Sequence, residues 1–162
     1  MEKLARKLGR LLKRTRQMLV TAESCTGGWA AQAVTAIPGS SDWFERGFVT
    51  YSNAAKLEVL GVSRMALKKF GAVSEETARE MARGALARSH ASIALSVTGV
   101  AGPTGGSREK PVGFVCFGWA KERTVRSESR RFKGNRASVR RQSVVHALKG
   151  VIALLEEKKS QG

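Results

Sequence analysis

Residues 18–37, MLVTAESCTGGWAAQAVTAI, contain a short apolar run, a turn of small residues and a helical pattern in direct succession. The run MLVTAE predicts a buried strand, and CTGGWAAQAVTAI predicts a helix that ends before Pro38, because the residue preceding a proline disfavours helical geometry. A strand that leads straight into a helix is typical of α/β folds, where ligands bind beyond the carboxyl ends of strands. This junction therefore predicts both a fold class and the place of a site.

The rest of the chain alternates between helical and strand patterns. Leu4, Leu8, Leu11 and Leu12 recur at helical spacing and predict an amphipathic first helix with a basic outer face, more typical of a packed helix than of a targeting or membrane-surface element. Strand-type runs follow at 43–52, 92–99, 112–120 and 124–132, and helical patterns at 53–60, 74–89 and 135–155. We expect an α/β fold, a three-layer α/β/α sandwich with a mixed β-sheet, formed by a single domain over residues 1–162.

Composition narrows the class of protein. Of 162 residues, 42% are hydrophobic and 26% charged, as in ordinary globular proteins, and 29 Lys and Arg against 13 Asp and Glu give a net charge of +16. Such a charge attracts polyanions and phosphorylated metabolites. The lack of a recognisable nucleic-acid module and of basic residues interleaved with aromatics argues against nucleic acid as the main ligand.

Cysteine and histidine usage predicts a reduced, metal-free protein. Cys25 and Cys116 lie in unrelated contexts and form no metal-type pair, and there are only two histidines. The sequence has neither an apolar run of membrane-spanning length nor a secretory signal. We therefore expect a cytoplasmic protein with reduced thiols and no zinc site that does not bind membranes. No cofactor is expected.

The turn ESCTGG, residues 23–28, carries three nucleophilic side chains, those of Ser24, Cys25 and Thr26. Small residues let a ligand approach the backbone, and the glycines tolerate the positive φ of a sharp turn. The turn alone leaves two interpretations open, because Ser24 or Thr26 could simply cap the following helix. A catalytic Cys25 would ordinarily require a histidine activator, and none is placed for it.

Two further segments are candidates for anion binding. The loop TGVAGPTGG, residues 98–106, lacks Walker A and GxGxxG spacing, yet its successive N–H groups could form an anion nest; the alternative is a plain flexible loop. Arg136 and Arg140 share one face if the last helix begins near Asn135, where they could clamp a phosphate or merely form a solvated basic face.

A hydroxyl nucleophile needs a base. His90 lies at an expected helix-to-strand turn and His146 in the middle of the last helix, so neither adjoins a catalytic loop. Lysine is the alternative, because Ser–Lys pairs recur among amide hydrolases. Lys56 follows a strand end within an apolar helical segment, where burial among its neighbours and the field of nearby arginines would lower its pKa.

The order of these motifs resembles the CinA C-terminal domain family. The motifs are TAESCTGG, IPGSSDWFERGFVTYSNAAK, LGV, GAVSEETAREMARGAL, VTGVAGPTGG and EKPVGFV, and the similarity runs from about residue 17 to about residue 150. The resemblance implies hydrolysis of nicotinamide mononucleotide to nicotinate mononucleotide and ammonia, in a three-layer, commonly dimeric protein without a metal.

Residue by residue, the resemblance implies a catalytic Ser24–Lys56 pair assisted by Tyr51. The substrate-binding residues that we expect are Thr26, Gly27, Thr98, Gly99, Gly102, Gly105, Gly106, Arg136 and Arg140. Two other classes of function remain open from sequence: a competence- or DNA-associated binding protein, and a non-catalytic nucleotide-binding domain. Release of ammonia by the purified protein would separate the enzyme from both.

Overall fold

Five strands form one mixed sheet in the computed structural model, which describes residues 1–157. They are β1 (Leu19–Glu23), β2 (Phe44–Val49), β3 (Ile93–Gly99), β4 (Phe114–Lys121) and β5 (Thr124–Arg131), in the spatial order β2-β1-β3-β4-β5. β1 pairs in parallel with β2 and β3, whereas β3–β4 and β4–β5 are antiparallel. The predicted mixed sheet is confirmed.

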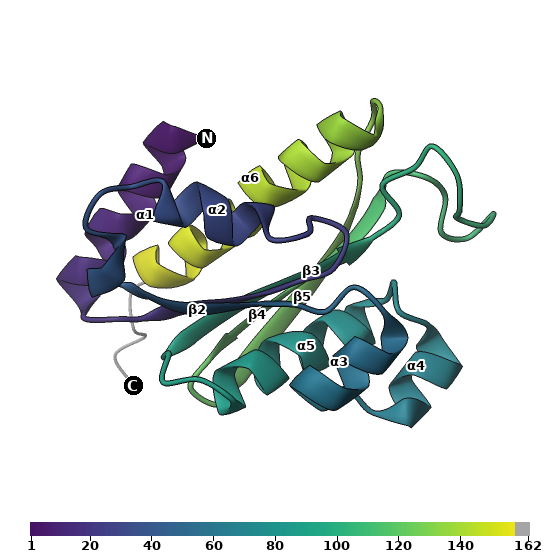
Figure 1. The fold of residues 1–162 in the computed structure, drawn as a ribbon, viewed down its shortest axis with the longest axis horizontal. Helices are drawn as coiled ribbons and strands as arrows, with labels where there is room; N and C mark the ends of the chain where they lie inside the picture. The colour runs from purple at the N-terminus through teal and green to yellow at the C-terminus, as the bar shows by residue number, and fades with distance from the viewer. Residues whose placement is uncertain (158–162) are drawn as a thin grey trace.

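Helices cover both faces of this sheet (Figure 1). One face carries α1 (Glu2–Thr15), α2 (Trp29–Thr35) and α6 (Arg136–Glu156); the other carries α3 (Asn53–Leu60), α4 (Arg64–Phe70) and α5 (Glu75–Ala87). A short 3-10 helix, η1 (Ser40–Asp42), leads into β2. The three-layer α/β/α sandwich is thereby confirmed. Within residues 1–157, no helix has both the length and the apolar character needed to cross a membrane.

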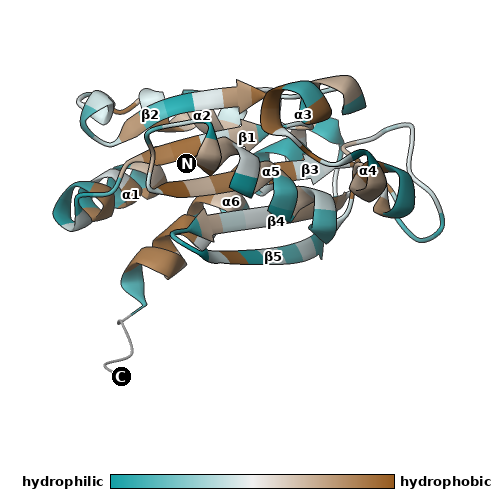
Figure 2. Cartoon of the chain, turned by 90° about the horizontal axis from the view of Figure 1, so that it is seen from below, coloured by the Kyte–Doolittle hydropathy of each residue, from teal (hydrophilic) through white to brown (hydrophobic). Residues whose placement is uncertain are grey.

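Side-chain alternation along β1 divides the hydrophobic interior into two cores. Leu19 packs with residues of α1, α2 and α6, while Val20 and Ala22 pack with residues of α5 on the opposite face. All five residues of β1 are buried, because a central strand covered on both faces has no solvent side. β5 lies at one edge of the sheet and is largely hydrophilic (Figure 2), as its sequence TVRSESRR requires of a strand with a solvated face.

The helix after β1 begins later than its sequence pattern predicts. Residues 24–28 form a turn, in which Gly27 and Gly28 have φ angles of 60° and 99°. This left-handed geometry cannot continue a right-handed helix, so α2 starts only at Trp29. The sequence also does not predict α4, whose seven residues make only about two turns, too few to show a period.

The chain folds so that its candidate residues lie at one edge of the sheet. The carboxyl ends of β1, β2 and β3 share this edge because the three strands are parallel. β5 ends there as well, and α6 follows it with Asn135 as N-cap, whose side chain accepts the Ser138 N–H at 2.9 Å. The loop between β3 and β4 projects from the same edge (Figure 1).

Candidate active site

Ser24 is the first residue after β1 and is held by the sheet. Its backbone N–H donates to the Val97 carbonyl at 2.9 Å, which extends the ladder between β1 and β3 by one residue. Its side chain is 7% exposed and lies on the same face of the sheet as α3. The strand ladder therefore fixes the hydroxyl at the edge where the candidate loops meet.

Lys56 reaches Ser24 from α3. Its Nζ lies 2.9 Å from Ser24 Oγ and donates to the carbonyls of Thr50 at 2.9 Å and Tyr51 at 3.1 Å. The side chain is 1% exposed, and this burial lowers the pKa of Lys56 from its ordinary value. The structure thus brings together the two residues that the sequence proposed as nucleophile and base.

The cause of the pKa shift differs in part from the expectation. Ala54 is exposed and Val59 is 41% exposed, so the neighbours along α3 do not bury the amine. Burial of Lys56 among the ends of β1 and β2 is the dominant cause, and the expected arginine field does not contribute to its pKa. The sequence therefore identified Lys56 as a buried lysine but attributed its burial to neighbours along α3, whereas the ends of β1 and β2 bury it.

The contacts of Lys56 suit two protonation states. A charged ammonium has three N–H donors, and the Ser24 hydroxyl and the two carbonyls accept all three. A neutral amine has two N–H groups, which the carbonyls of Thr50 and Tyr51 accept, and its lone pair then faces the Ser24 hydroxyl. The neutral form is therefore oriented to take the proton of Ser24.

The start of α2 is capped by Glu23, and not by Ser24 or Thr26. The fully buried carboxylate of Glu23 accepts the N–H groups of Ala30 at 2.7 Å and Ala31 at 3.1 Å, and the Thr26 hydroxyl at 2.6 Å. The capping alternative for Ser24 and Thr26 is therefore wrong. Sequence reasoning missed Glu23, because it lies six residues before α2 and acts on amides seven and eight residues ahead, beyond the range of ordinary capping patterns.

The remaining nucleophilic candidates of the turn are less suited than Ser24. Cys25 is 6% exposed, and burial raises the pKa of its thiol to about 12, so it stays protonated at neutral pH. The Thr26 hydroxyl is fully buried and donates to Glu23. Within the turn, Ser24 alone has a hydroxyl in contact with the Lys56 amine, whereas the Thr26 hydroxyl is committed to Glu23.

The two arginines of α6 lie beside the turn. Arg140 donates through Nε to the Cys25 carbonyl at 3.0 Å and through Nη2 to the Thr26 carbonyl at 3.1 Å. Arg136 donates to the Gly102 carbonyl at 2.8 Å and to the Tyr51 hydroxyl at 3.3 Å. Both arginines thus adjoin the candidate site, and their role toward a phosphate stays a prediction.

The glycines of the loop after β3 adopt backbone geometry that favours glycine. Gly102, Gly105 and Gly106 have φ angles of 82°, 83° and 82°. Two other expected glycines are tightly packed: a Cβ on Gly99 would lie 2.7 Å from a Val115 methyl, and one on Gly27 would lie 3.3 Å from Arg140. These contacts explain why the positions are small, and their contact with substrate stays a prediction.

Thr98 has a structural contact of its own. It is 1% exposed and its hydroxyl donates to the Ala72 carbonyl at 2.9 Å, which ties the segment before α5 to β3. Tyr51 differs, because its side chain is 62% exposed beside the Ser24–Lys56 pair. For both, a role toward substrate stays a prediction.

The histidines lie away from the turn. His90 is exposed at the end of the segment that joins α5 to β3, and His146 packs in α6 against the rings of Phe117, Trp119 and Phe132. The expectation that neither serves Ser24 stays a prediction, and the contacts of His146 are with aromatic rings and Glu128. Among residues 1–157, no group of three or more His, Cys, Asp or Glu side chains is arranged to hold a metal ion.

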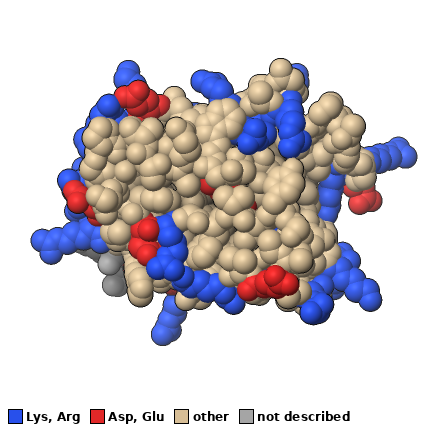
Figure 3. Space-filling model, in the orientation of Figure 1, with Lys and Arg blue, Asp and Glu red and all other residues tan. Residues whose placement is uncertain are grey.

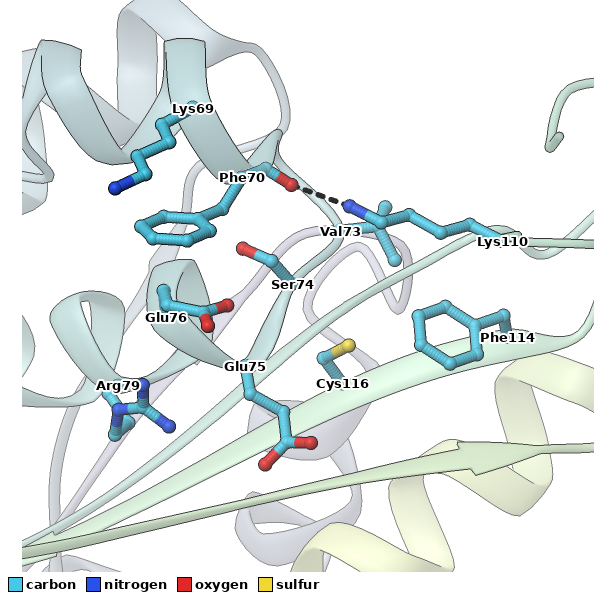
Figure 4. Close-up of a pocket in the computed structure, with 10 residues that line it drawn as sticks. All are labelled: Lys69, Phe70, Val73, Ser74, Glu75, Glu76, Arg79, Lys110, Phe114 and Cys116. Atoms are coloured by element: carbon cyan, nitrogen blue, oxygen red, sulfur yellow. Dashed lines mark hydrogen bonds between the residues drawn. The ribbon is translucent and has the colours of Figure 1, made fainter.

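A separate hollow of about 460 Å³ lies between α4, α5 and β4 (Figure 4). Phe70 and Phe114 contribute aromatic walls, and Lys110 donates to the Phe70 carbonyl at 2.5 Å. Its one thiol belongs to Cys116, which is fully buried, and burial raises its pKa to about 12. The hollow therefore presents no activated nucleophile comparable to Ser24.

Basic side chains dominate the charged surface. On the face shown in Figure 3 they project around the outline of the molecule, and acidic side chains are fewer. This distribution agrees with the net charge of +16 and favours anionic ligands.

Comparisons with known proteins cover almost the whole chain. The sequence model of the CinA C-terminal domain matches residues 1–155. Nicotinamide-nucleotide amidohydrolase PncC from Pseudomonas putida is 52% identical over 151 residues, which are 93% of this chain and 94% of that protein. The protein of the same name from Escherichia coli strain K12 is 52% identical over 149 residues, with 90% and 88% of the two chains covered.

Solved structures agree with these relatives. The competence/damage inducible protein CihA from Agrobacterium tumefaciens has a TM-score of 0.93 and 47% identity, covering 96% of this chain and 95% of that one. A competence-damaged protein (CinA) superfamily protein from Escherichia coli has a TM-score of 0.91 and 37% identity, covering 94% and 89% of the two chains. The matched regions include the sheet and both helical layers.

Proposed function

Because the chain belongs to the CinA C-terminal domain family and, like its curated relatives, is an amidohydrolase, we propose that it deamidates nicotinamide mononucleotide. The products are nicotinate mononucleotide and ammonia, as in the pyridine nucleotide cycle. Ser24 is the nucleophile and Lys56 its base. The observation that carries this proposal is the 2.9 Å contact between the buried Lys56 amine and the Ser24 hydroxyl.

Acylation begins when neutral Lys56 takes the proton of Ser24 as its Oγ attacks the carboxamide carbon. A carboxamide is a poor electrophile, so the attack needs both this proton transfer and stabilisation of the oxyanion. When the tetrahedral intermediate collapses, the C–N bond breaks and the Lys56 ammonium returns its proton to the departing nitrogen. Ammonia leaves, and an ester of Ser24 remains.

Deacylation repeats the sequence with water. Lys56, again neutral, takes a proton from water as the hydroxide attacks the ester carbonyl. Collapse of the second intermediate breaks the bond to Ser24 Oγ, which recovers its proton from Lys56, and the carboxylic acid product ionises on release. The carbonyls of Thr50 and Tyr51 keep the amine in place through both half-reactions, since each accepts one of its N–H groups.

The backbone beside Ser24 offers donors for the oxyanion. Within residues 1–157, the N–H groups of Cys25 and Thr26 donate to no oxygen, although the Cys25 N–H contacts its own thiol, whereas the N–H groups of Ser24 and Gly27 both donate to carbonyls. Unpaired amides next to a nucleophile are the usual source of an oxyanion hole. We assign this role to the amide of Cys25, because Thr26 is fully buried.

Binding of the nucleotide phosphate falls to Arg136 and Arg140. Both residues lie in the first turns of α6; the Arg136 guanidinium contacts the loop at Gly102 and the Tyr51 hydroxyl, and the Arg140 guanidinium contacts the turn after β1. Arg136 can exchange its carbonyl contact for a stronger, charge-assisted contact with phosphate, whereas Arg140 keeps its contacts with the turn through Nε and Nη2 and offers Nη1 to the phosphate. Tyr51 then lines the mouth of the site.

The test is ammonia release from nicotinamide mononucleotide by the purified, chelator-treated protein. We expect turnover by the wild-type chain, none above background by Ser24→Ala, and an increase of intact mass by the nicotinate nucleotide acyl group in rapidly quenched wild-type protein. Binding of the nucleotide without ammonia release would overturn the proposal and favour a non-catalytic binding domain.

A further inference from the structure

Glu23 is a buried acid without a basic partner. Its side chain is fully buried, and among residues 1–157 no Lys, Arg or His forms an ion pair with it. Isolated carboxylates are costly to bury, so the donors that surround this one must offset that cost. The three donors are the Thr26 hydroxyl and the backbone N–H groups of Ala30 and Ala31.

These contacts close the nucleophile turn into a ring. The backbone of Glu23 is fixed in the sheet, where its carbonyl accepts the Thr50 N–H at 2.9 Å. Its side chain spans the whole turn and accepts the N–H groups of Ala30 and Ala31 at the start of α2. Ser24 lies inside this ring, so its position is constrained both by the Val97 carbonyl and by the contacts of the Glu23 carboxylate.

The turn is also held from its carbonyl side. Arg140 donates to the carbonyls of Cys25 and Thr26. The Glu23 carboxylate accepts hydrogen bonds from the first N–H groups of α2 and from the Thr26 hydroxyl. Neither the Glu23 carboxylate nor any backbone oxygen within residues 1–157 accepts the N–H of Cys25. The acid and the arginine together hold the turn without using the amide of Cys25.

We propose that Glu23 is a positioning residue for the reaction: its carboxylate anchors the start of α2 and thereby fixes Ser24 and the Cys25 amide that follows it. This inference rests on the proposed function. Because Glu23 touches no substrate atom in this role, its loss lowers kcat and leaves KM nearly unchanged. The N–H groups of Ala30 and Ala31 already donate to the Glu23 carboxylate and are not available to a second anion. The substrate phosphate therefore binds on the α6 side of the turn.

The direct test is Glu23→Gln, which keeps the size of the side chain but replaces one acceptor by an NH₂ group facing a backbone N–H. We expect kcat to fall about a hundredfold and KM to change by less than about threefold.

The matched control is Glu80→Gln. Glu80 also holds a helix start, accepting the Ser63 N–H at 2.7 Å and its hydroxyl at 3.1 Å, but it holds α4. Its variant should lose stability and keep kcat.

Two measurements keep the inference independent of the substrate. A fluorophosphonate probe reports the reactivity of Ser24 by intact mass, and its labelling rate should fall in Glu23→Gln but not in Glu80→Gln. In Glu23→Ala, added acetate can occupy the vacated space and should restore labelling in a saturable way, as a purely destabilising change would not allow.

The outcomes separate the two proposals. A wild-type chain that is labelled at Ser24 but releases no ammonia overturns the proposed function, and the labelling rates still decide the role of Glu23. If kcat and the labelling rate of folded Glu23→Gln stay within about twofold of wild type, Glu23 is a helix cap only and the inference is wrong.

Discussion

At the scale of single residues, the Ser24–Lys56 pair depends on one short contact between side chains that lie 32 positions apart. Residue type and local context made both members candidates, because Lys56 lies in the helical segment after a strand and Ser24 lies in the turn of small residues. The family resemblance then selected this pair from the alternatives that the residues alone left open. The partners of Lys56 were not predictable. Two of them are backbone carbonyls, of Thr50 and Tyr51, and every residue carries a carbonyl.

The first prediction concerns the choice of nucleophile. Ser24→Ala should lower kcat by about 10⁴-fold or more, because the acyl-enzyme can no longer form. Cys25→Ala should stay active, since its thiol is buried with a pKa raised to about 12. Both are measured by ammonia release, with circular dichroism as the control for folding. A folded but inactive Cys25→Ala would overturn the assignment.

The second prediction concerns pH. Burial lowers the pKa of Lys56, and only the neutral amine accepts the Ser24 proton, so kcat/KM should be low at acidic pH and rise to a plateau above that pKa. Lys56→Arg should lose activity by about 10²–10⁴-fold, because a guanidinium does not deprotonate. His90→Gln, at an exposed site, is the control and should keep the same rising limb. If Lys56→Arg kept some activity and its kcat/KM still rose with pH in the same way, the base would be a residue other than Lys56.

The third prediction concerns stability. The pKa of Lys56 is lower in the folded chain than in the unfolded chain, so the unfolded chain binds more protons between the two values and stability rises with pH across that window. Replacement by Met removes the buried amine at similar volume. Lys56→Met should therefore raise Tm at neutral pH, and its advantage should shrink as pH approaches the ordinary lysine pKa. A constant difference in Tm from pH 6 to 10 would contradict this linkage.

At the scale of elements, helices with long apolar periods were predictable, and the turn before α2 was not. Ser74 and Asn135 cap α5 and α6 as their sequence patterns indicate, accepting N–H groups three residues ahead. The start of α2 depends instead on two left-handed glycines and on Glu23, whose carboxylate acts seven and eight residues ahead. Capping rules that search three residues ahead miss such a contact.

The fourth prediction belongs to α6. Arg136→Ala should raise KM for the mononucleotide, because it removes a charge-assisted contact that contributes about 1.5–3 kcal/mol to the binding free energy. The effect on the riboside should be smaller, since the riboside lacks the phosphate. Arg140→Ala should also lower kcat, because Arg140 holds the carbonyls of the nucleophile turn. Arg141→Ala, one residue along and exposed, is the control and should change neither constant. Equal losses on both substrates would assign Arg136 a role in folding only.

At the scale of the whole molecule, the three-layer sandwich followed from alternating patterns along the chain. The order of the strands in the sheet could not be predicted, because the sequence of β1 does not indicate that β2 and β3 are its neighbours. The loop after β3 was recognisable by its glycines, yet its contact with α6 through Arg136 joins segments 34 residues apart. The homodimer expected from the family resemblance stays a prediction.

The central place of β1 has a consequence for synthesis. β1 is the first strand to emerge from the ribosome, but its second neighbour, β3, begins 74 residues after it, at Ile93 opposite Leu19. The N–H of Ser24 donates to the carbonyl of Val97, so this N–H has no partner in the sheet until that residue has been made. A stalled nascent chain ending near residue 70 would contain both Ser24 and Lys56, yet should fail to react with a serine-directed probe. Hydrolytic competence would thus arise late in translation.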